Sequence, residues 1–277
     1  MYPLRSAETA GLWPVSRGFC RPFEAALKIA PEGWIVILVF SAVALVVGGS
    51  AILLLQIWGV PIMLAMLLLI GWSLWFFRDP LRVTPPGNDQ VISPADGKVI
   101  RVDSMPMPKE LVAQGATPPP MQRIAIFLNV FNVHVNRVPA AGKITKMVYT
   151  PGKFFTASLD KASEHNERSA VLMTDPRGRV IAFSQIAGWV ARRIVNHLRE
   201  GQTVQAGERF GLIRFGSRAE IFLPTDAEVL VQVGDRVIAG ETLLATLAAP
   251  RATLETVVRS AGVSAAIGGS AVGGGAT

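Results

Sequence analysis

The longest hydrophobic stretch of the chain spans residues 33–77 and contains no charged residue. A helix of that length would measure about 67 Å at about 1.5 Å per residue, whereas one membrane crossing needs about 20 residues. Gln56 and the turn signal Gly59-Val60-Pro61 interrupt the stretch near its middle. The pattern therefore predicts a membrane hairpin of two helices, the first over residues 34–55 and the second from residue 57 or 61 to residue 77.

Two other interpretations fit this stretch less well. Buried core helices of a soluble protein rarely contain so long an uncharged run, and a cleaved signal peptide starts earlier and ends in small residues. Aromatic residues near the ends of the predicted helices are typical of the belts at the membrane–water boundary. They are Trp34, Trp72, Trp75, Phe76 and Phe77.

Basic residues flank the stretch on both sides, whereas the predicted turn carries no charge. They are Arg5, Arg17, Arg21 and Lys28 before it, and Arg78 and Arg82 after it. Because positively charged flanks stay in the cytoplasm, the bulk of the chain is predicted on the cytoplasmic face of the cell membrane. The formal net charge of +7 agrees, since cationic groups favour an anionic lipid surface.

After residue 78 the pattern changes to short β-rich runs separated by Gly, Pro, Asp and Asn, as in an antiparallel sheet or barrel. Strands are predicted over residues 90–92, 98–102, 124–128, 134–137, 144–149, 170–174, 180–185, 210–213 and 219–222. Short helices are predicted over residues 154–161 and 187–197. Four segments result: an N-terminal interfacial segment (1–32), the hairpin (33–77), a β-rich domain (78–262) and a disordered tail (263–277).

Residues 226–245 show a strand–turn–strand spacing similar to that of lipoyl and biotinyl carrier domains and other barrel-sandwich hybrids. Carriers of that kind present a modifiable lysine at a hairpin tip, but no lysine follows Lys161. The similarity therefore concerns architecture alone. The predicted fold is a β-rich α+β domain resembling a barrel-sandwich hybrid, preceded by the membrane hairpin.

Charge and cysteine content exclude several classes of protein. The basic residues are scattered, without the aromatic-interleaved patch of a nucleic-acid-binding protein. The single cysteine, Cys20, excludes an internal disulfide and a multi-cysteine metal site, and it is typical of a reducing compartment.

Five short motifs carry the candidate chemistry. A Gly-Ser pair such as Gly216-Ser217 alone indicates no more than a turn, but here it stands in Arg214-Phe215-Gly216-Ser217-Arg218 and follows four other motifs. These are Ser93-Pro94-Ala95-Asp96-Gly97-Lys98, Phe131-Asn132-Val133-His134-Val135-Asn136-Arg137, His165-Asn166-Glu167-Arg168 and Ile186-Ala187-Gly188-Trp189-Val190-Ala191-Arg192-Arg193. In this order and at these spacings, the set resembles the short form of phosphatidylserine decarboxylase, a pyruvoyl enzyme, over about residues 76–247.

The resemblance implies an enzyme that cuts itself between Gly216 and Ser217 by serinolysis. The expected products are two chains, 1–216 and 217–277, with a covalent pyruvoyl cofactor formed from Ser217. The mature enzyme is then expected to decarboxylate phosphatidylserine to phosphatidylethanolamine through a Schiff base. Its expected partners are phosphatidylserine and membrane lipid, and the two chains of the cleaved proenzyme are expected to stay bound to each other. A homodimer is compatible with the sequence. No nucleic acid or metal is expected.

The resemblance also assigns roles to individual residues. His134 is the expected base for self-cleavage, Asp96 the carboxylate that orients it, and His165 the second candidate base. Long-form members carry another histidine at the position of Arg137, so one histidine is expected to cover two roles here, or His165 shares them. Arginine binds phosphate well, and three arginines are candidates for the lipid phosphate: Arg137, Arg168 and Arg214.

Two other functions compete with this interpretation. One is a non-enzymatic, membrane-tethered β-domain that binds a lipid headgroup or a protein, in which Gly216-Ser217 is an intact turn, Asp96 a turn residue and His134 a strand residue. The other is a membrane-anchored zinc peptidase, but His134 is not part of a His-x-His or His-Glu-x-x-His motif. His197, flanked by arginines, is expected to be structural or exposed at the surface.

Overall fold

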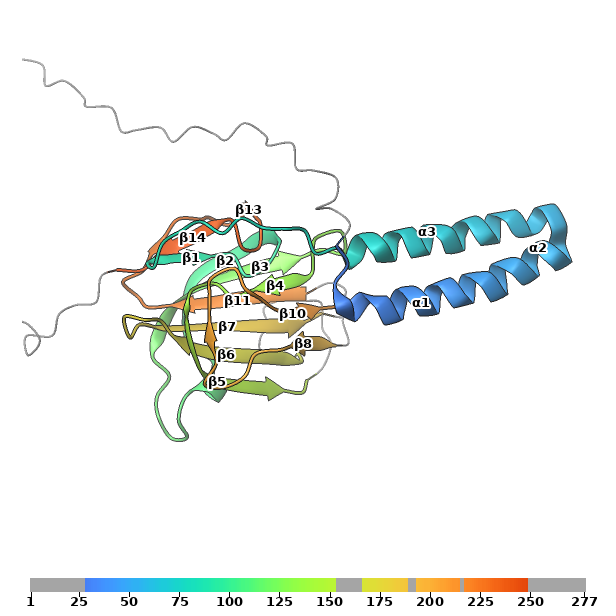
Figure 1. The fold of residues 1–277 in the computed structure, drawn as a ribbon. Helices are drawn as coiled ribbons and strands as arrows, with labels where there is room; N and C mark the ends of the chain where they lie inside the picture. The colour runs from blue at the N-terminus through green and yellow to red at the C-terminus, as the bar shows by residue number, and fades with distance from the viewer. Residues whose placement is uncertain (1–27, 153–165, 189–192, 215–216, 249–277) are drawn as a thin grey trace, which may run out of the picture. The chain divides into compact units, whose positions relative to one another are not determined.

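The computed structural model describes residues 28–152, 166–188, 193–214 and 217–248 of the chain. They fall into two compact units that divide between Leu81 and Arg82. The first unit is helical and the second is built from strands (Figure 1). Most of the predicted N-terminal segment, the predicted helix over residues 154–161 and the predicted tail lie outside the described residues.

The helical unit consists of apolar segments that follow one another between Pro31 and Phe76. They are η2 (Pro31–Gly33), α1 (Trp34–Val43), the π-helical η3 (Ala44–Gly48), α2 (Gly49–Leu55), η4 (Gln56–Gly59) and α3 (Val60–Phe76). Gln56 has a φ of 50°. Since few residues other than glycine adopt a positive φ, Gln56 marks a defined break between α2 and α3.

Glycines let the segments on either side of this break approach closely. A Cβ on Gly59 would lie 2.3 Å from the carbonyl oxygen of Ala51, and one on Gly48 would lie 2.9 Å from the sulfur of Met63. The absence of a side chain at these two positions therefore permits the contact. Figure 1 shows α3 beside α1 and α2.

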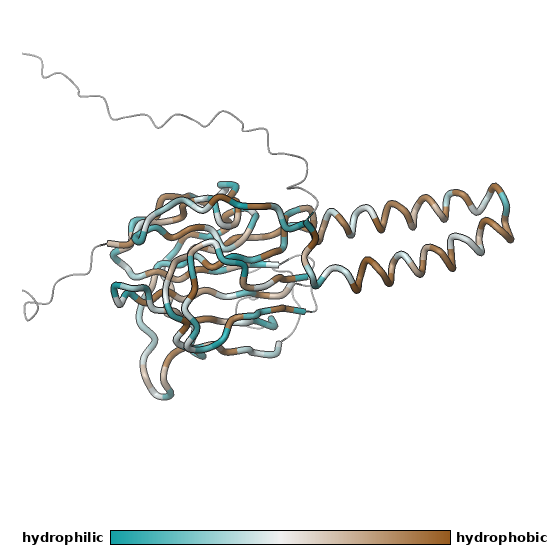
Figure 2. Tube along the Cα trace, viewed as in Figure 1, coloured by the Kyte–Doolittle hydropathy of each residue, from teal (hydrophilic) through white to brown (hydrophobic). Residues whose placement is uncertain are grey.

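Most residues of the helical unit are hydrophobic (Figure 2). By length and composition the helical run Pro31–Phe76 is sufficient to cross a membrane, and only 22% of its most apolar window is buried, whereas the core helix of a soluble protein is mostly buried. Length and composition identify Pro31–Phe76 as one membrane-spanning candidate. That it crosses the membrane twice stays a prediction.

An eight-stranded antiparallel sheet dominates the second unit, in the order β13-β2-β3-β11-β7-β6-β5-β9. Its strands are β2 (Gly97–Pro106), β3 (Pro120–Leu128), β5 (Gly142–Thr150), β6 (Arg168–Thr174), β7 (Val180–Ala187), β9 (Thr203–Val204), β11 (Ser217–Leu223) and β13 (Arg236–Val237). The sheet curls into half a barrel. Its central strand, β11, has neighbours on both sides along its length.

Two three-stranded sheets complete the unit. One has the order β4-β10-β8, and its strands are β4 (Val135–Arg137), β10 (Arg209–Ile213) and β8 (Ile194–Asn196). The other has the order β1-β14-β12, with β1 (Gln90–Ile92), β14 (Leu243–Thr246) and β12 (Glu228–Val229). The connection between β2 and β3 contains the 3-10 helix η5 (Lys109–Leu111).

The alternation of side chains along β11 separates two faces of the large sheet. Ala219, Ile221 and Leu223 point into the main apolar core, which they share with residues such as Ile126. Phe222 points to the opposite face, into a smaller apolar cluster with Met107, Leu111 and Met121. Ser217 is therefore on the face of the main core, and Arg218 and Glu220 are on the other.

The structure confirms a β-rich domain preceded by an N-terminal helical region. The helix predicted over residues 187–197 is wrong, because Ala187 ends β7 and Ile194–Asn196 form β8. Pairing with Gly211, Leu212 and Ile213 of β10 places Ile194 and Val195 in a ladder that suits their β-branched side chains. The turn-and-strand pattern over residues 226–245 is present, but β12 pairs with β14, whereas β13 pairs with β2.

Candidate active site

Ser217 is the first residue of β11 and lies within the large sheet. It pairs with Leu128 of β3 and Ala187 of β7. The residue is completely buried, and its Oγ has no hydrogen-bond partner among the described residues. A buried hydroxyl without a partner destabilises the fold, so stability does not account for a serine at this position.

His134 comes just before β4 and is also completely buried. Its Nδ1 lies 3.0 Å from the carbonyl oxygen of Asn132. A carbonyl only accepts hydrogen bonds, so Nδ1 carries the proton and the lone pair of the neutral ring is on Nε2. The backbone of the preceding turn is itself fixed, since Asn132 Oδ1 accepts a hydrogen bond from the Asn129 N–H at 2.9 Å.

Backbone contacts bring His134 and Ser217 into one neighbourhood. The N–H of Ile213, at the end of β10, donates to the carbonyl oxygen of His134 at 3.3 Å. The Ile213 side chain packs against Ala187, the residue that pairs with Ser217. His134 therefore contacts Ile213, Ser217 pairs with Ala187, and Ile213 and Ala187 contact each other.

Two buried side-chain amides join β4, the strand that follows His134, to the face of the large sheet that carries Ser217. Gln185 Nε2 donates to Asn136 Oδ1 at 2.8 Å. Asn136 belongs to β4, two residues after His134, and Gln185 pairs with Ala219 on the same face as Ser217. This hydrogen bond therefore holds β4 over the beginning of β11.

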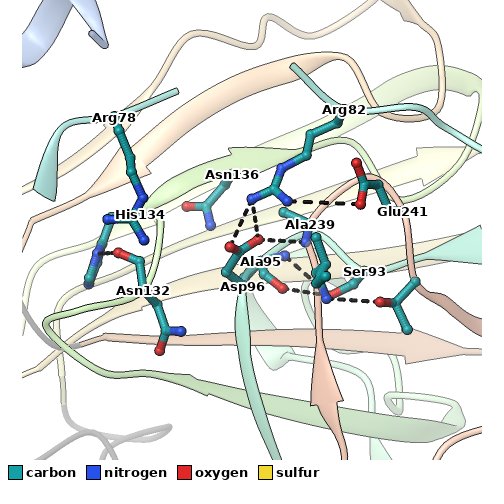
Figure 3. Close-up of polar contacts among 12 residues, drawn as sticks. Arg78, Arg82, Ser93, Ala95, Asp96, Asn132, His134, Asn136, Ala239 and Glu241 are labelled. Atoms are coloured by element: carbon teal, nitrogen blue, oxygen red, sulfur yellow. Dashed lines mark hydrogen bonds and ion pairs between the residues drawn. The ribbon is translucent and has the colours of Figure 1, made fainter. Parts of the chain in front are cut away.

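Asp96 lies in the turn before β2, where Arg82 and the Ala239 N–H donate hydrogen bonds to it (Figure 3). Arg82 Nη2 donates to both of its carboxylate oxygens, at 3.0 and 2.8 Å, and the Ala239 N–H donates to Oδ1 at 2.7 Å. Glu241 lies 3.9 Å from the Arg82 guanidinium on the side away from Asp96. The carboxylate is therefore fixed in place by an arginine and a backbone N–H.

The turn that carries Asp96 is anchored on two sides. Ser93 Oγ donates to the Ala95 carbonyl at 2.7 Å, and the Ser93 backbone is bonded to Thr242 and Gly240. On the other side, the Pro94 carbonyl accepts a hydrogen bond from the Arg137 N–H at 2.9 Å. Because Arg137 belongs to β4, this turn and His134 are attached to the same short strand.

Comparison of the sequence with known proteins identifies the family to which this chain is similar. The profile of phosphatidylserine decarboxylase matches residues 69–245. The chain is 52% identical over 216 residues to a phosphatidylserine decarboxylase proenzyme of Paramagnetospirillum magneticum, covering 78% of this chain and 85% of that one. It is 46% identical over 224 residues to a proenzyme of the same name from Magnetococcus marinus, covering 81% and 97% of the two chains.

The chain belongs to the phosphatidylserine decarboxylase family. The prediction made from the five motifs is therefore confirmed at the level of the family. A third relative, from Syntrophus aciditrophicus, shares 53% identity over 175 residues, or 63% of this chain and 79% of its own. It too is named a phosphatidylserine decarboxylase proenzyme, and a proenzyme is a chain that matures by processing.

The other predicted residues have more varied settings in this family member. Gly216 and His165 lie outside the described residues. The residue after His165, Asn166, is completely buried and donates to the carbonyl of Ala187 at 2.7 Å. The motif that contains His165 therefore contacts the residue that pairs with Ser217. His197 is exposed, as expected.

The three predicted phosphate-binding arginines do not share one setting. Arg137 Nη1 donates to the Gly207 carbonyl at 3.0 Å, and Arg214 follows Ile213 directly, with its backbone N–H donating to the Arg193 carbonyl. Arg168 instead pairs with Glu110 at 2.5 Å. It lines a cavity of about 510 Å³ that also contains Glu220 and Phe222, on the face of the sheet opposite Ser217.

Several residues of the site were not predicted from the sequence. They are Arg82, Asn132, Asn136, Gln185 and Glu241. Asn132 and Asn136 stand inside the motif around His134, so their position was a usable signal. Nothing local marks the other three, because their contacts depend on segments far apart in the chain.

Two further observations concern titratable and metal-binding side chains among the described residues. Partial burial raises the pKa of Tyr149 above its ordinary value, as do the hydrogen bond that its hydroxyl donates to Glu167 and the negative charge of that carboxylate. The phenol is therefore neutral at physiological pH and cannot act as a base there. In addition, no group of three or more His, Cys, Asp and Glu in the described part of the chain is arranged to hold a metal ion.

Proposed function

We propose that this chain decarboxylates phosphatidylserine to phosphatidylethanolamine, with a pyruvoyl group that it makes from its own Ser217. The observation that carries the proposal is the completely buried Ser217 hydroxyl, which lacks a partner among the described residues at the start of the central strand of a phosphatidylserine decarboxylase family member. A hydroxyl that adds nothing to stability is expected where the serine itself reacts and is converted into another group.

The pyruvoyl group forms in three steps from atoms of the chain and one water. The Ser217 Oγ adds to the Gly216 carbonyl carbon and the peptide C–N bond breaks, so that an ester replaces the amide. Loss of the Ser217 α-proton then expels the Gly216 carboxylate and leaves dehydroalanine at position 217. Water adds to its imine tautomer and ammonia departs, which leaves a pyruvoyl group at the start of chain 217–277 and a carboxylate at the end of chain 1–216.

His134 is the base that the geometry favours for the first step. Its Nδ1 is committed to the Asn132 carbonyl, so Nε2 can accept the Ser217 Oγ proton and return it to the departing nitrogen. In this proposal the Asn132 carbonyl fixes the tautomer, and Asp96 with Arg82 fixes the turn packed against β4. A direct orienting role of Asp96, and a share of the work for His165, stay predictions.

The pyruvoyl group supplies an electron-withdrawing carbonyl that accepts the electron pair left when carbon dioxide departs. The residues of the chain do the rest. Arg137 is three residues after His134, and Arg214 directly follows Ile213, whose N–H donates to the His134 carbonyl. We assign these two arginines to the lipid phosphate. Arg168 is the weaker candidate, because it is paired with Glu110 on the opposite face of the sheet.

The lipid substrate explains the apolar helical unit. We infer that residues 33–77 form a two-helix hairpin in the cell membrane, that residues 78–262 form a barrel-sandwich-hybrid-like catalytic domain on its cytoplasmic face, and that residues 1–32 and 263–277 flank them. The support is the exposed apolar surface of Pro31–Phe76 and the basic residues on both of its flanks.

Labelling of Cys20 tests this topology. Because Cys20 precedes the hairpin, we expect a membrane-impermeant thiol reagent to leave it unlabelled in intact cells and to label it after the membrane is opened. A cysteine introduced at Trp58, in the predicted turn, is the matched control and should label in intact cells. Labelling of Cys20 before the membrane is opened would contradict the topology.

Substrate preference tests the assignment to a lipid. Carbon dioxide release should be measured in mixed micelles from phosphatidylserine and from glycerophosphoserine, which has the same headgroup but no acyl chains. We expect kcat/KM to be at least about 100-fold higher for the lipid, because acyl chains concentrate the headgroup at the surface where the enzyme is anchored. Equal turnover of the soluble compound would overturn the lipid assignment and leave the self-cleavage intact.

A further inference from the structure

A row of four charged side chains begins at Arg218, the residue after Ser217, on the other face of the sheet. Arg218 is completely buried, and its Nη2 lies 2.5 Å from Glu220 Oε1. The same Glu220 oxygen is 3.4 Å from Arg123 Nη1. Arg123 in turn donates to both carboxylate oxygens of Asp103, at 2.8 and 2.5 Å. We call these four residues the charge row.

The charge row crosses three adjacent strands on the face of the sheet opposite Ser217. Arg218 and Glu220 belong to β11, Arg123 to β3 and Asp103 to β2. Arg218, Glu220 and Arg123 are only 0%, 3% and 5% exposed. Removing charges from water is so unfavourable that well-packed apolar residues would usually stabilise such a site as well or better. The charge row therefore calls for an explanation other than stability.

Self-cleavage changes what holds residue 217 in place. Before it, the peptide bond to Gly216 fixes Ser217 from one side and β11 fixes it from the other. Afterwards, residue 217 is the first residue of a separate chain, and chain ends fray unless they are tied down. The reacting carbonyl would then sit on the least restrained residue of the strand.

We propose that the charge row is a clamp that keeps this new chain end in register, and that Arg218 is a positioning residue for decarboxylation. Fraying of the first two residues of β11 would withdraw Arg218 from Glu220, so that the buried row would lose one of its two positive charges. A slip of one residue would turn Arg218 into the apolar core beside Ala219 and Ile221. The clamp acts from the far face, so Arg218 does not touch the substrate. This inference rests on the self-cleavage proposed above.

The test compares Arg218→Met with a matched control in cleaved and uncleaved protein. The control is Arg179→Met, which breaks another arginine–carboxylate pair, with the buried Asp175 at 2.6 Å, at the turn between β6 and β7. Hydrogen exchange of peptides covering residues 217–223 is measured in the self-cleaved enzyme and in the uncleaved Ser217→Ala background. The kcat and KM of each cleaved variant are measured with phosphatidylserine in mixed micelles.

In Arg218→Met we expect exchange of these peptides to rise at least tenfold in the cleaved enzyme and less than twofold in the uncleaved chain. We also expect kcat to fall at least tenfold with KM within threefold of the wild-type value. Arg218→Lys, which keeps the charge, should recover part of kcat. Arg179→Met should change neither quantity. Glu220→Gln, which keeps the shape of its side chain, should move both in the direction of Arg218→Met and replaces it if that variant does not fold.

Three outcomes would overturn the clamp. They are an unchanged kcat in Arg218→Met, an equal rise of exchange in cleaved and uncleaved protein, and failure of Arg218→Met to cleave itself, which would assign Arg218 to the cleavage step. A wild-type protein that remains one chain would instead overturn the self-cleavage, so the two failures are distinguishable on a denaturing gel.

Discussion

Ser217→Ala is expected to accumulate as one uncut chain of 29.7 kDa without decarboxylase activity. The substitution removes the hydroxyl that attacks the Gly216 carbonyl, so no ester forms, no carboxylate can be eliminated and position 217 cannot become dehydroalanine or a pyruvoyl group. Loss of an essential nucleophile lowers turnover by roughly 10⁶-fold in well-studied hydrolases, and the loss here is expected to be at least that large. Denaturing electrophoresis and carbon dioxide release measure the two effects.

The wild-type protein is the positive control for this experiment. It should give two bands, and the small chain should react with hydrazine-type carbonyl reagents and resist stepwise chemical sequencing from its N-terminus. Ser217→Cys keeps a nucleophile of similar size and should still cut, though the site is close-packed. A full-length single chain that still releases carbon dioxide would contradict the whole mechanism.

Much of the strand content could be predicted because it is encoded locally. The predicted strand over residues 90–92 coincides with β1, and those over residues 170–174 and 180–185 fall within β6 and β7. Short, mostly apolar runs bounded by turn residues suffice to mark such segments. Residues 187–197 were assigned wrongly because their local pattern did not reveal that Ile194–Asn196 pair with β10.

The candidate site was predicted only in part, for a related reason. The motifs marked His134, Asp96 and Ser217, since these residues stand in recognisable local sequences. The groups that hold them depend on long-range contacts, such as Gln185 with Asn136 across 49 residues and Ala239 with Asp96 across 143. Ser217 was also expected between two strands, whereas the ladders with β3 and β7 make it the first residue of one.

His134→Ala is expected to slow self-cleavage by about 10² to 10⁴-fold, the usual contribution of a positioned general base. The uncut chain should accumulate after synthesis and convert slowly, if at all, into chains 1–216 and 217–277. Because His134 is completely buried, its removal also leaves a cavity. Loss of cleavage alone would therefore not separate a lost base from a disturbed fold.

Chemical rescue separates these two causes. Imidazole added to His134→Ala can enter the vacated space and supply the missing base, so cleavage should accelerate with imidazole concentration. His134→Gln fills most of that space with a side chain that cannot act as a base, and it should remain uncut with or without imidazole. Asp96→Asn keeps the shape of the carboxylate and should cleave more slowly than the wild type but faster than His134→Ala, because the Asn132 carbonyl still fixes the His134 tautomer. Normal two-chain maturation of His134→Ala without imidazole would remove His134 from the role of base and transfer it to His165.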